Sequence, residues 1–131
     1  MAQNDSLGDR MKRHESVPKN YLISRTPVVA RIDGRAFHSY VRRLKGLDPS
    51  LQDTPFSIIM HDVMMATTAA LVHHVQGCEL GYTQSDEISL LIRDWDTLDT
   101  QAWFDYNVQK MTSLMGAIAS NAFNFAFGKH Y

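Results

Sequence analysis

This sequence has little of what exported or membrane-spanning proteins rely on. One of its 131 residues is a cysteine, Cys78, so an internal disulfide is impossible and a disulfide-stapled secreted domain is disfavoured. No hydrophobic run approaches the ~20 residues that span a bilayer, and the N-terminus lacks the apolar core of a signal peptide. We therefore expect a cytoplasmic protein with no membrane association.

The sequence also lacks the high net charge and the shortage of apolar residues that mark disordered chains. Hydrophobic residues make up 44% and charged residues 21%, with a formal net charge of -1, which is typical of a folded domain. The length suits one compact domain. Neither GxxxxGK[ST] nor GxGxxG occurs, which disfavours P-loop and dinucleotide-binding folds.

The charges that are present are divided unevenly along the chain. Residues 1–45 carry ten of the thirteen lysines and arginines against four acids, whereas the remainder carries three bases and ten acids. This polarity suits a phosphate-rich partner at one end and a cation-binding acidic site at the other. A solvated basic surface is the alternative interpretation.

Hydrophobic periodicity predicts the element order β-α-β-β-α and an α+β fold class. The expected elements are a strand at 27–33, a helix within 51–76, a hairpin of strands at 78–83 and 87–92, and a long helix from 104 to 126. We expect residues 1–20 to form an arm or a short helix, and residues 44–54 to form a loop. A complete four-stranded split β-α-β sheet would need one more strand than this sequence supplies.

Two acidic signatures fall at the ends of neighbouring predicted strands. Asp33-Gly34 follows the first strand, and Ser85-Asp86-Glu87 lies at the hairpin turn. Each alone is typical of a simple turn. Together they would place carboxylates close enough to need a divalent cation, and Mg²⁺ accepts such hard oxygen ligands together with substrate phosphates. Asp33 and Asp86 are therefore the candidate metal ligands, and Gly34 offers a carbonyl.

The residues directly after Asp33 suit a triphosphate. Backbone amides in a turn form a concave anion site, and a nearby cation adds charge. The segment consists of Gly34, Arg35, Ala36, Phe37 and His38. We expect it to bind a nucleoside triphosphate, with two-metal catalysis of phosphoryl or nucleotidyl transfer at the adjacent acids.

Three motifs together resemble the tRNA-His guanylyltransferase family, including its phage and bacterial relatives that repair tRNA 5′ ends. They are RIDGRAFHSY, GYTQSDEISLL and KMTS, and the resemblance runs from about Gly8 to Phe125. It implies a polymerase-type palm that adds a guanylate to the tRNA 5′ end in the 3′-to-5′ direction. The 5′ phosphate is activated with ATP or GTP, and the 3′-hydroxyl of an incoming nucleotide then displaces the activating group.

The resemblance also implies roles for individual residues. Asp33, Asp86 and the Gly34 carbonyl would bind two Mg²⁺ ions, and Glu87 would be an essential acid beside them. Lys45 and Asp48 are similar to a Lys-Pro-x-Asp segment near the nucleotide, although Gly46 replaces the proline. Lys110 matches a phosphate-contacting lysine. The nucleotide-binding set implied in this way is Asp33, Gly34, Arg35, Ala36, Phe37, His38, Lys45, Ser85, Asp86 and Lys110.

Two features limit what the resemblance implies. Asn107 stands where nucleus-encoded eukaryotic members tend to have arginine, so the second nucleotide site would bind phosphate more weakly or differently. The family also continues with a further palm strand and a segment linked to tRNA handling, which this sequence lacks. We therefore expect residues 1–131 to form a single, truncated palm-type catalytic domain, with tRNA and nucleoside triphosphates as partners and a homo-oligomeric assembly.

Two other classes of protein remain as alternatives. A nucleotide cyclase or another palm-type transferase would use the same metal chemistry on free nucleotides, but its GGDEF-like hairpin does not occur. A remnant or binding subunit would keep the palm without catalysing.

Overall fold

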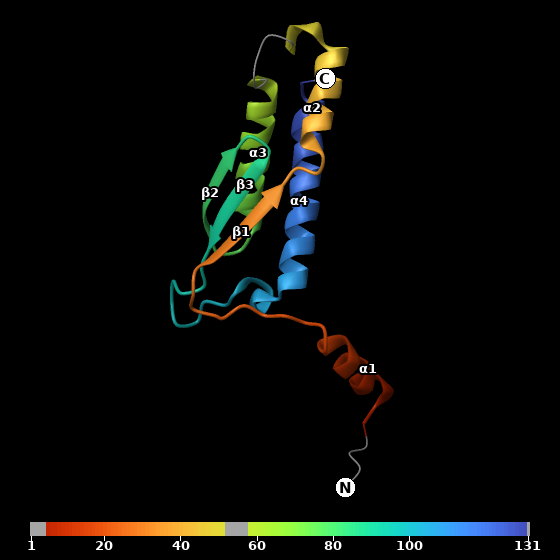
Figure 1. Ribbon diagram of the computed structural model, residues 1–131. Coiled ribbons are helices and arrows are strands. Elements are labelled where there is room, and N and C mark those ends of the chain that lie inside the picture. Colours follow the sequence, from red (N-terminus) through yellow and green to blue (C-terminus); the bar gives the residue numbers. More distant parts are fainter. Residues whose placement is uncertain (1–4, 52–57, 131) are drawn as a thin grey trace.

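The computed structural model describes residues 5–51 and 58–130 (Figure 1). Its elements are α1 (Leu7–Ser16), β1 (Val28–Asp33), α2 (Phe37–Leu47), the 3-10 turn η1 (Pro49–Leu51), α3 (Ile58–His74), β2 (Cys78–Gln84), β3 (Glu87–Ile92), the 3-10 turn η2 (Trp103–Tyr106) and α4 (Val108–Gly128). None of the helices in those two ranges has the length and apolar character needed to cross a membrane.

An antiparallel sheet of three strands, in the order β1-β3-β2, confirms the predicted α+β class. β1 pairs with β3 from Val28 opposite Ile92 to Asp33 opposite Glu87. β2 pairs with β3 through the predicted hairpin, whose turn contains Ser85 in a left-handed conformation (φ 57°). β1 therefore lies at one edge of the sheet, and its end reaches the hairpin turn.

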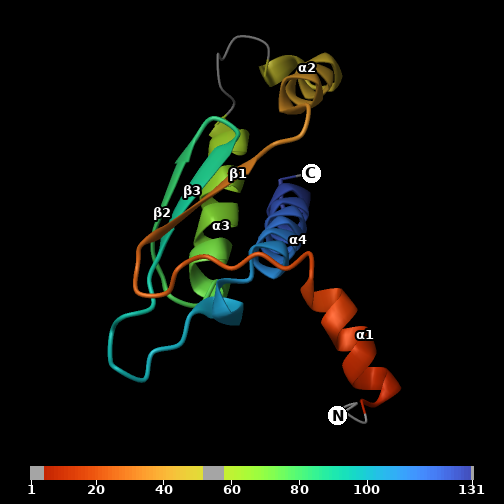
Figure 2. The same cartoon turned by 60° about the horizontal axis from the view of Figure 1, so that its bottom comes forward.

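Alternation of side chains along the strands decides which face of the sheet is covered. Val28, Ile88, Leu90 and Ile92 are buried, and they join residues of α3 and α4 in one hydrophobic core. Figure 2 shows both helices on this side of the sheet. Full burial of side chains of this size contributes about 1.5–3 kcal/mol each. The two helices therefore fix the sheet from one side.

Glycine allows β2 to lie directly against α3. A Cβ atom at Gly81 would approach Val72 Cγ2 to 2.6 Å and Thr68 Cγ2 to 2.7 Å. Such distances are shorter than real Cβ contacts, so a larger residue at Gly81 would force the strand and the helix apart. The close contact positions the hairpin, and with it the Ser85-Asp86 turn.

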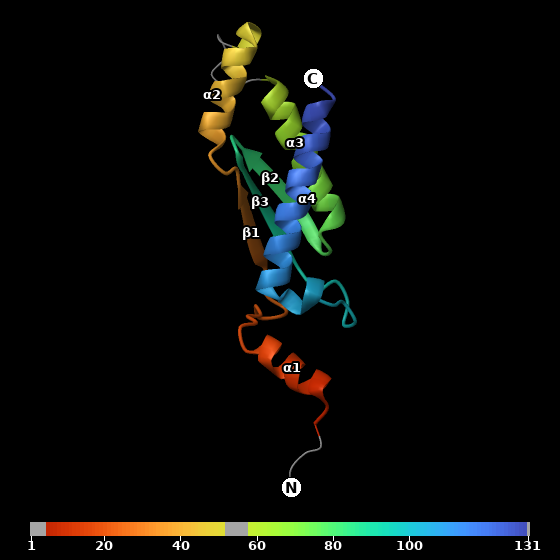
Figure 3. The same cartoon turned by 90° about the vertical axis from the view of Figure 1, so that its right-hand side faces the viewer.

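α1 projects away from the rest of the molecule (Figures 1 and 3). It begins after Ser6, whose side chain accepts a hydrogen bond from the Asp9 amide, and it contains no buried residue. This part of the predicted arm is therefore a helix at Leu7–Ser16. Two hydrogen bonds hold the segment after α1 against the start of α4. The Val108 amide donates to the Asn20 carbonyl (2.9 Å), and the Leu22 amide donates to the Tyr106 carbonyl (3.0 Å).

The predicted element order missed α2, and two predicted boundaries were wrong. The loop predicted for 44–54 begins too early, because α2 continues to Leu47 and η1 follows; residues 52–57 lie outside the described ranges. The last helix begins at Val108 instead of 104, because Phe104, Asp105 and Tyr106 have positive φ angles of 49°, 53° and 58°. Left-handed residues cannot start an α-helix, so Asn107 caps it, its side-chain oxygen accepting from the Lys110 amide (3.1 Å).

Candidate active site

The two acidic signatures meet at one end of the sheet. Because β1 and β3 are antiparallel, the end of β1 lies beside the start of β3, and Asp33 pairs with Glu87. The Gly34 amide then donates a 3.1 Å hydrogen bond to the Asp86 carbonyl. This contact joins the turn after β1 to the hairpin turn, although the two segments are far apart in the sequence.

Glu87 differs from the other two acids in its partner. Like charges directly opposite one another on a sheet are destabilising, and Asp33 and Glu87 are such a pair. Arg31 relieves this repulsion through an ion pair with Glu87. The hydrogen bond to Glu87 and the charges of Glu87 and Asp33 raise the pKa of Arg31. Asp33 and Asp86 form no ion pair with any residue in the described ranges.

The turn from β1 to α2 has an unusual backbone. Ala36, which precedes the first residue of α2, is left-handed (φ 52°), a conformation that costs a non-glycine residue roughly 1–2 kcal/mol. A Cβ atom at Gly34 would approach Phe37 Cδ2 to 2.6 Å, so the turn is as tight as glycine allows. The Ser39 amide donates to the Ala36 carbonyl (3.0 Å), whereas the first two amides of α2, those of Phe37 and His38, have no acceptor within an α-helix. Strain of this kind is often concentrated at functional sites.

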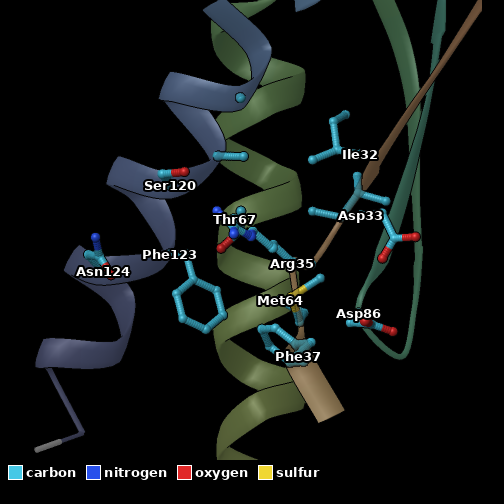
Figure 4. A pocket seen from close by; sticks show the side chains of 14 residues that line it. Ile32, Asp33, Arg35, Phe37, Met64, Thr67, Asp86, Ser120, Phe123 and Asn124 are labelled. Carbon is cyan, nitrogen blue, oxygen red and sulfur yellow. The ribbon is translucent and has the colours of Figure 1, made fainter. Parts of the chain in front are cut away.

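A cavity of about 350 Å³ adjoins the two acidic turns. It is large enough for a small-molecule ligand. In Figure 4, Asp33 and Asp86 lie on the sheet side of the cavity, and Arg35 extends from the turn toward Thr67 of α3. Its lining consists of Ile32, Asp33, Gly34, Arg35, Phe37, Met64, Thr67, Asp86, Ile88, Gly116, Ala119, Ser120, Phe123 and Asn124.

The other predicted residues do not line this cavity. Ala36, His38, Ser85 and Glu87 are immediate chain neighbours of residues that do. Lys45 lies in the last turn of α2, with Asp48 directly after that helix.

Lys110 lies in the first turn of α4, where its Nζ is 5.6 Å from the centre of the Phe104 ring. About 15 Å of helix separates Lys110 from Ser120, which does line the cavity. Asn107, the residue noted as a departure from the family, caps the same helix end. The structure thus brings Asp33, Gly34, Arg35, Phe37 and Asp86 to one cavity and leaves Lys110 apart from it.

Sequence reasoning missed the residues that α4 contributes to the cavity. Gly116, Ser120 and Asn124 recur at steps of four, so they share one face of the helix. This small and polar row adjoins the buried row of Met111, Met115 and Ala119. A polar row beside an apolar one was therefore visible in the sequence as a signal for a cavity wall.

The donors at the two turns fit a hard divalent cation. Two carboxylates without an ion-pair partner among the described residues, together with an adjacent backbone carbonyl, are oxygen ligands of the kind Mg²⁺ uses with substrate phosphates. Within residues 5–51 and 58–130, no group of three or more His, Cys, Asp or Glu side chains has the spacing of a metal site. A metal bound here would therefore depend on ligands from the substrate or from the backbone.

The sheet with acidic turns at its end, backed by two helices and joined to a ligand-sized cavity, defines a palm-type domain. A family model described as "Thg1: tRNAHis guanylyltransferase" matches residues 8–131. The chain belongs to this family.

Solved structures support this assignment, and a viral protein is also similar to the chain. A bacterial tRNA(His) guanylyltransferase (Thg1)-like protein in complex with GTP has a TM-score of 0.83 and 40% identity, covering 96% of this chain and 57% of that one. The corresponding complex with ATP gives the same TM-score and identity, with coverages of 97% and 52%. The protein named "Uncharacterized protein R259" of Acanthamoeba polyphaga mimivirus is 29% identical over 136 residues, 95% of this chain and 41% of its own length. The chain thus spans about half the length of these relatives.

Proposed function

We propose that this chain carries the nucleotidyl-transfer site of an enzyme that adds a guanylate to the 5′ end of tRNA in the 3′-to-5′ direction. Family membership supports the type of reaction, and the solved relatives that bind GTP and ATP support those nucleotides as substrates. The single observation that carries the proposal is the hydrogen bond from the Gly34 amide to the Asp86 carbonyl, because it holds the two acidic turns together.

Asp33, Asp86 and the Gly34 carbonyl would hold the Mg²⁺ ions. Bound there, Mg²⁺ would neutralise charge on the phosphate oxygens. Glu87, paired with Arg31, begins the neighbouring strand β3 and lies directly opposite Asp33. The proposal assigns Glu87 to the electrostatics of the site, since its carboxylate is already bound to a guanidinium.

The turn after Asp33 would bind the triphosphate. Arg35 lines the cavity and would supply a cation for phosphate oxygens, and the Phe37 and His38 amides at the start of α2 would provide neutral donors. Ser85 would contribute a hydroxyl; its Oγ donates to Asp86 Oδ1 at 3.2 Å. We further assign Ala36, His38, Lys45 and Lys110 to nucleotide contacts. Of these, Lys110 would serve a second nucleotide, because it lies at the other end of α4.

The proposed reaction has two steps, each with an attacking oxygen and a leaving group. First the tRNA 5′ phosphate attacks the α-phosphorus of ATP or GTP, and pyrophosphate leaves. The 3′-hydroxyl oxygen of an incoming GTP then bonds to the activated 5′ phosphorus, and the nucleoside monophosphate leaves. In both steps catalysis is mainly positioning and neutralisation of charge, which the acidic turns and Arg35 are placed to supply.

Replacement of Asp86 tests this function. We expect wild-type protein with ATP, labelled GTP and Mg²⁺ to label a 5′-monophosphorylated tRNA, and Asp86→Asn to reduce the label to background without lowering the unfolding temperature. The exposed Asp99 provides a matched control, and Asp99→Asn should retain full transfer. Wild-type protein that binds GTP but transfers none would instead make the chain a nucleotide-binding subunit.

The remaining assignments follow from the same proposal. We propose that residues 1–131 form one palm-type catalytic domain with an N-terminal arm at 1–20, that tRNA is the partner, and that the protein works in the cytoplasm as a homo-oligomer. Sedimentation of the purified protein, alone and with tRNA, measures both the oligomer and the complex.

A further inference from the structure

α2 has two faces of opposite character. Its half-buried residues are Phe37, Tyr40, Val41, Leu44 and Lys45, of which the first four have the i, i+3, i+4, i+7 spacing of one helical face. On the opposite face lie Ser39, Arg42, Arg43 and Gly46, all exposed. The helix is therefore amphipathic, with arginines along its outer side.

The inner face is held by aromatic contacts with the end of α4. The Phe37 and Phe123 rings lie 5.6 Å apart, edge to face, and Tyr40 lies 6.1 Å from Phe123 and 5.9 Å from Phe127. Figure 2 shows α2 beyond the end of the sheet, where no other labelled element covers its far side. The aromatic contacts thus direct Arg42 and Arg43 away from the body.

Positive charge predominates in this segment. Residues 34–47 contain four lysines and arginines and no acid, and Asp33 and Asp48 flank them directly. Arg42 and Arg43 form no ion pair with any residue of the described ranges. Exposed cations without an ion-pair partner in that part of the chain add little to the stability of the fold. Their arrangement instead suits a polyanion, whose phosphates would release counterions on binding.

The position of the two arginines indicates where a polyanion would lie. They follow Ala36 by about two turns of helix, which is about 10 Å. The turn before Ala36 holds Asp33, so the arginines are close to the acidic turns but outside the cavity. At about 3.4 Å per nucleotide along a strand, this span corresponds to about three nucleotides.

We propose that Arg42 and Arg43 bind the phosphate backbone of the RNA about three nucleotides from the 5′ end that reacts. The inference rests on the proposed function, because it takes the acidic turns as the reacting site. A membrane surface fits less well, since a membrane-bound helix exposes its apolar face beside its cations. In α2 that apolar face is turned toward α4.

The experiment compares charge reversals at the two ends of the molecule. Anisotropy of a 3′-labelled tRNA gives the binding constant at several salt concentrations for wild type, R42E/R43E and the neutral R42Q/R43Q. The matched control R10E/K12E changes the net charge equally on the exposed α1 helix, which lies apart from the acidic turns. GTP binding and thermal unfolding are measured for each.

Loss of two phosphate contacts should lower the slope of log K against log salt by about 1.5. We expect this drop in R42E/R43E and R42Q/R43Q, a wild-type slope in R10E/K12E, and unchanged GTP binding in all. An equal drop in R10E/K12E would mean that overall charge determines the slope. An unchanged slope in R42E/R43E would mean that the RNA binds elsewhere, and so would a variant that loses self-association but still binds RNA. Each of these results overturns the inference. Wild-type protein that binds GTP but no RNA would overturn the proposed function as well.

Discussion

Ala36 is a residue of the candidate site whose backbone conformation is strained by its side chain. Its φ of 52° favours glycine, because glycine has no Cβ atom to clash with the backbone in this conformation. Glycine does lose more conformational entropy on folding. We expect Ala36→Gly to stabilise the protein by about 0.5–1 kcal/mol, measured by chemical denaturation.

The matched control is an alanine in regular helix. Ala69 is exposed within α3, and Ala69→Gly should destabilise by about 1 kcal/mol. If both glycines destabilise equally, the left-handed turn at Ala36 is not the conformation in solution.

Tyr106 supplies a pH-dependent contribution to stability. Burial, together with the nearby Asp94 carboxylate, raises its pKa from 10.0 to about 12. Its hydroxyl has no hydrogen-bond partner of acceptable geometry in the described part of the chain. Because the folded state holds the phenolic proton more tightly, this contribution is complete below pH 10 and is lost as the pH rises to about 12.

Denaturant titrations from pH 8 to pH 12 check this prediction. Tyr106→Phe should lose less stability over that range than wild type, and should be near neutral at pH 8 because it removes an unpaired buried hydroxyl. The exposed Tyr82 serves as a control, and Tyr82→Phe should follow the wild-type profile. Parallel profiles for all three proteins would contradict the assignment to Tyr106.

Residue identities alone pointed to the part of the site that lies in turns. Asp33, Gly34 and Asp86 stood out because acids and glycine at strand ends are visible without a fold, and the structure brings them to one cavity. Met64 and Thr67 could not be chosen from the sequence in this way. Their role as cavity wall depends on how α3 and α4 pack against the sheet.

At the scale of elements, α2 depends on its aromatic contacts with α4. Phe123 touches both Phe37 and Tyr40, so Phe123→Ala should remove the main support of α2 and destabilise the protein by about 2 kcal/mol. It should also weaken GTP binding, because α2 begins at the turn that we propose binds the triphosphate.

The neighbouring Phe125 is 69% exposed and provides the matched control. Phe125→Ala should stay within about 0.5 kcal/mol of wild type and keep GTP binding. Equal losses in the two variants would indicate that α2 is not held by this contact.

α2 also shows why the prediction of elements was incomplete. The i, i+3, i+4, i+7 row from Phe37 to Leu44 was present in the sequence, but Gly46 and the nearby prolines favoured a loop over 44–54. Strand β1 and the hairpin were predicted within one residue of their observed bounds, because alternation and turn residues are local signals. The predicted start of α4 was wrong because the helical spacing of apolar residues continues through residues 104–106, although their backbone is left-handed.

At the scale of the whole molecule, the site depends on topology. The Gly34–Asp86 hydrogen bond exists only because β3 inserts between β1 and β2, an order that no local pattern specifies. That order also leaves β1 with a strand partner on one side among the described residues. An edge strand of this kind is open to pairing with further chain or with another protein.

The most direct test of the account is a double-mutant cycle for Mg²⁺-dependent GTP binding, measured by calorimetry. If Asp33 and Asp86 share their ions, Asp33→Asn and Asp86→Asn should each weaken binding by roughly tenfold or more, and the double variant should bind no more weakly than the poorer single variant. Binding that persists without Mg²⁺, or losses that simply add, would contradict a shared metal site at the two turns.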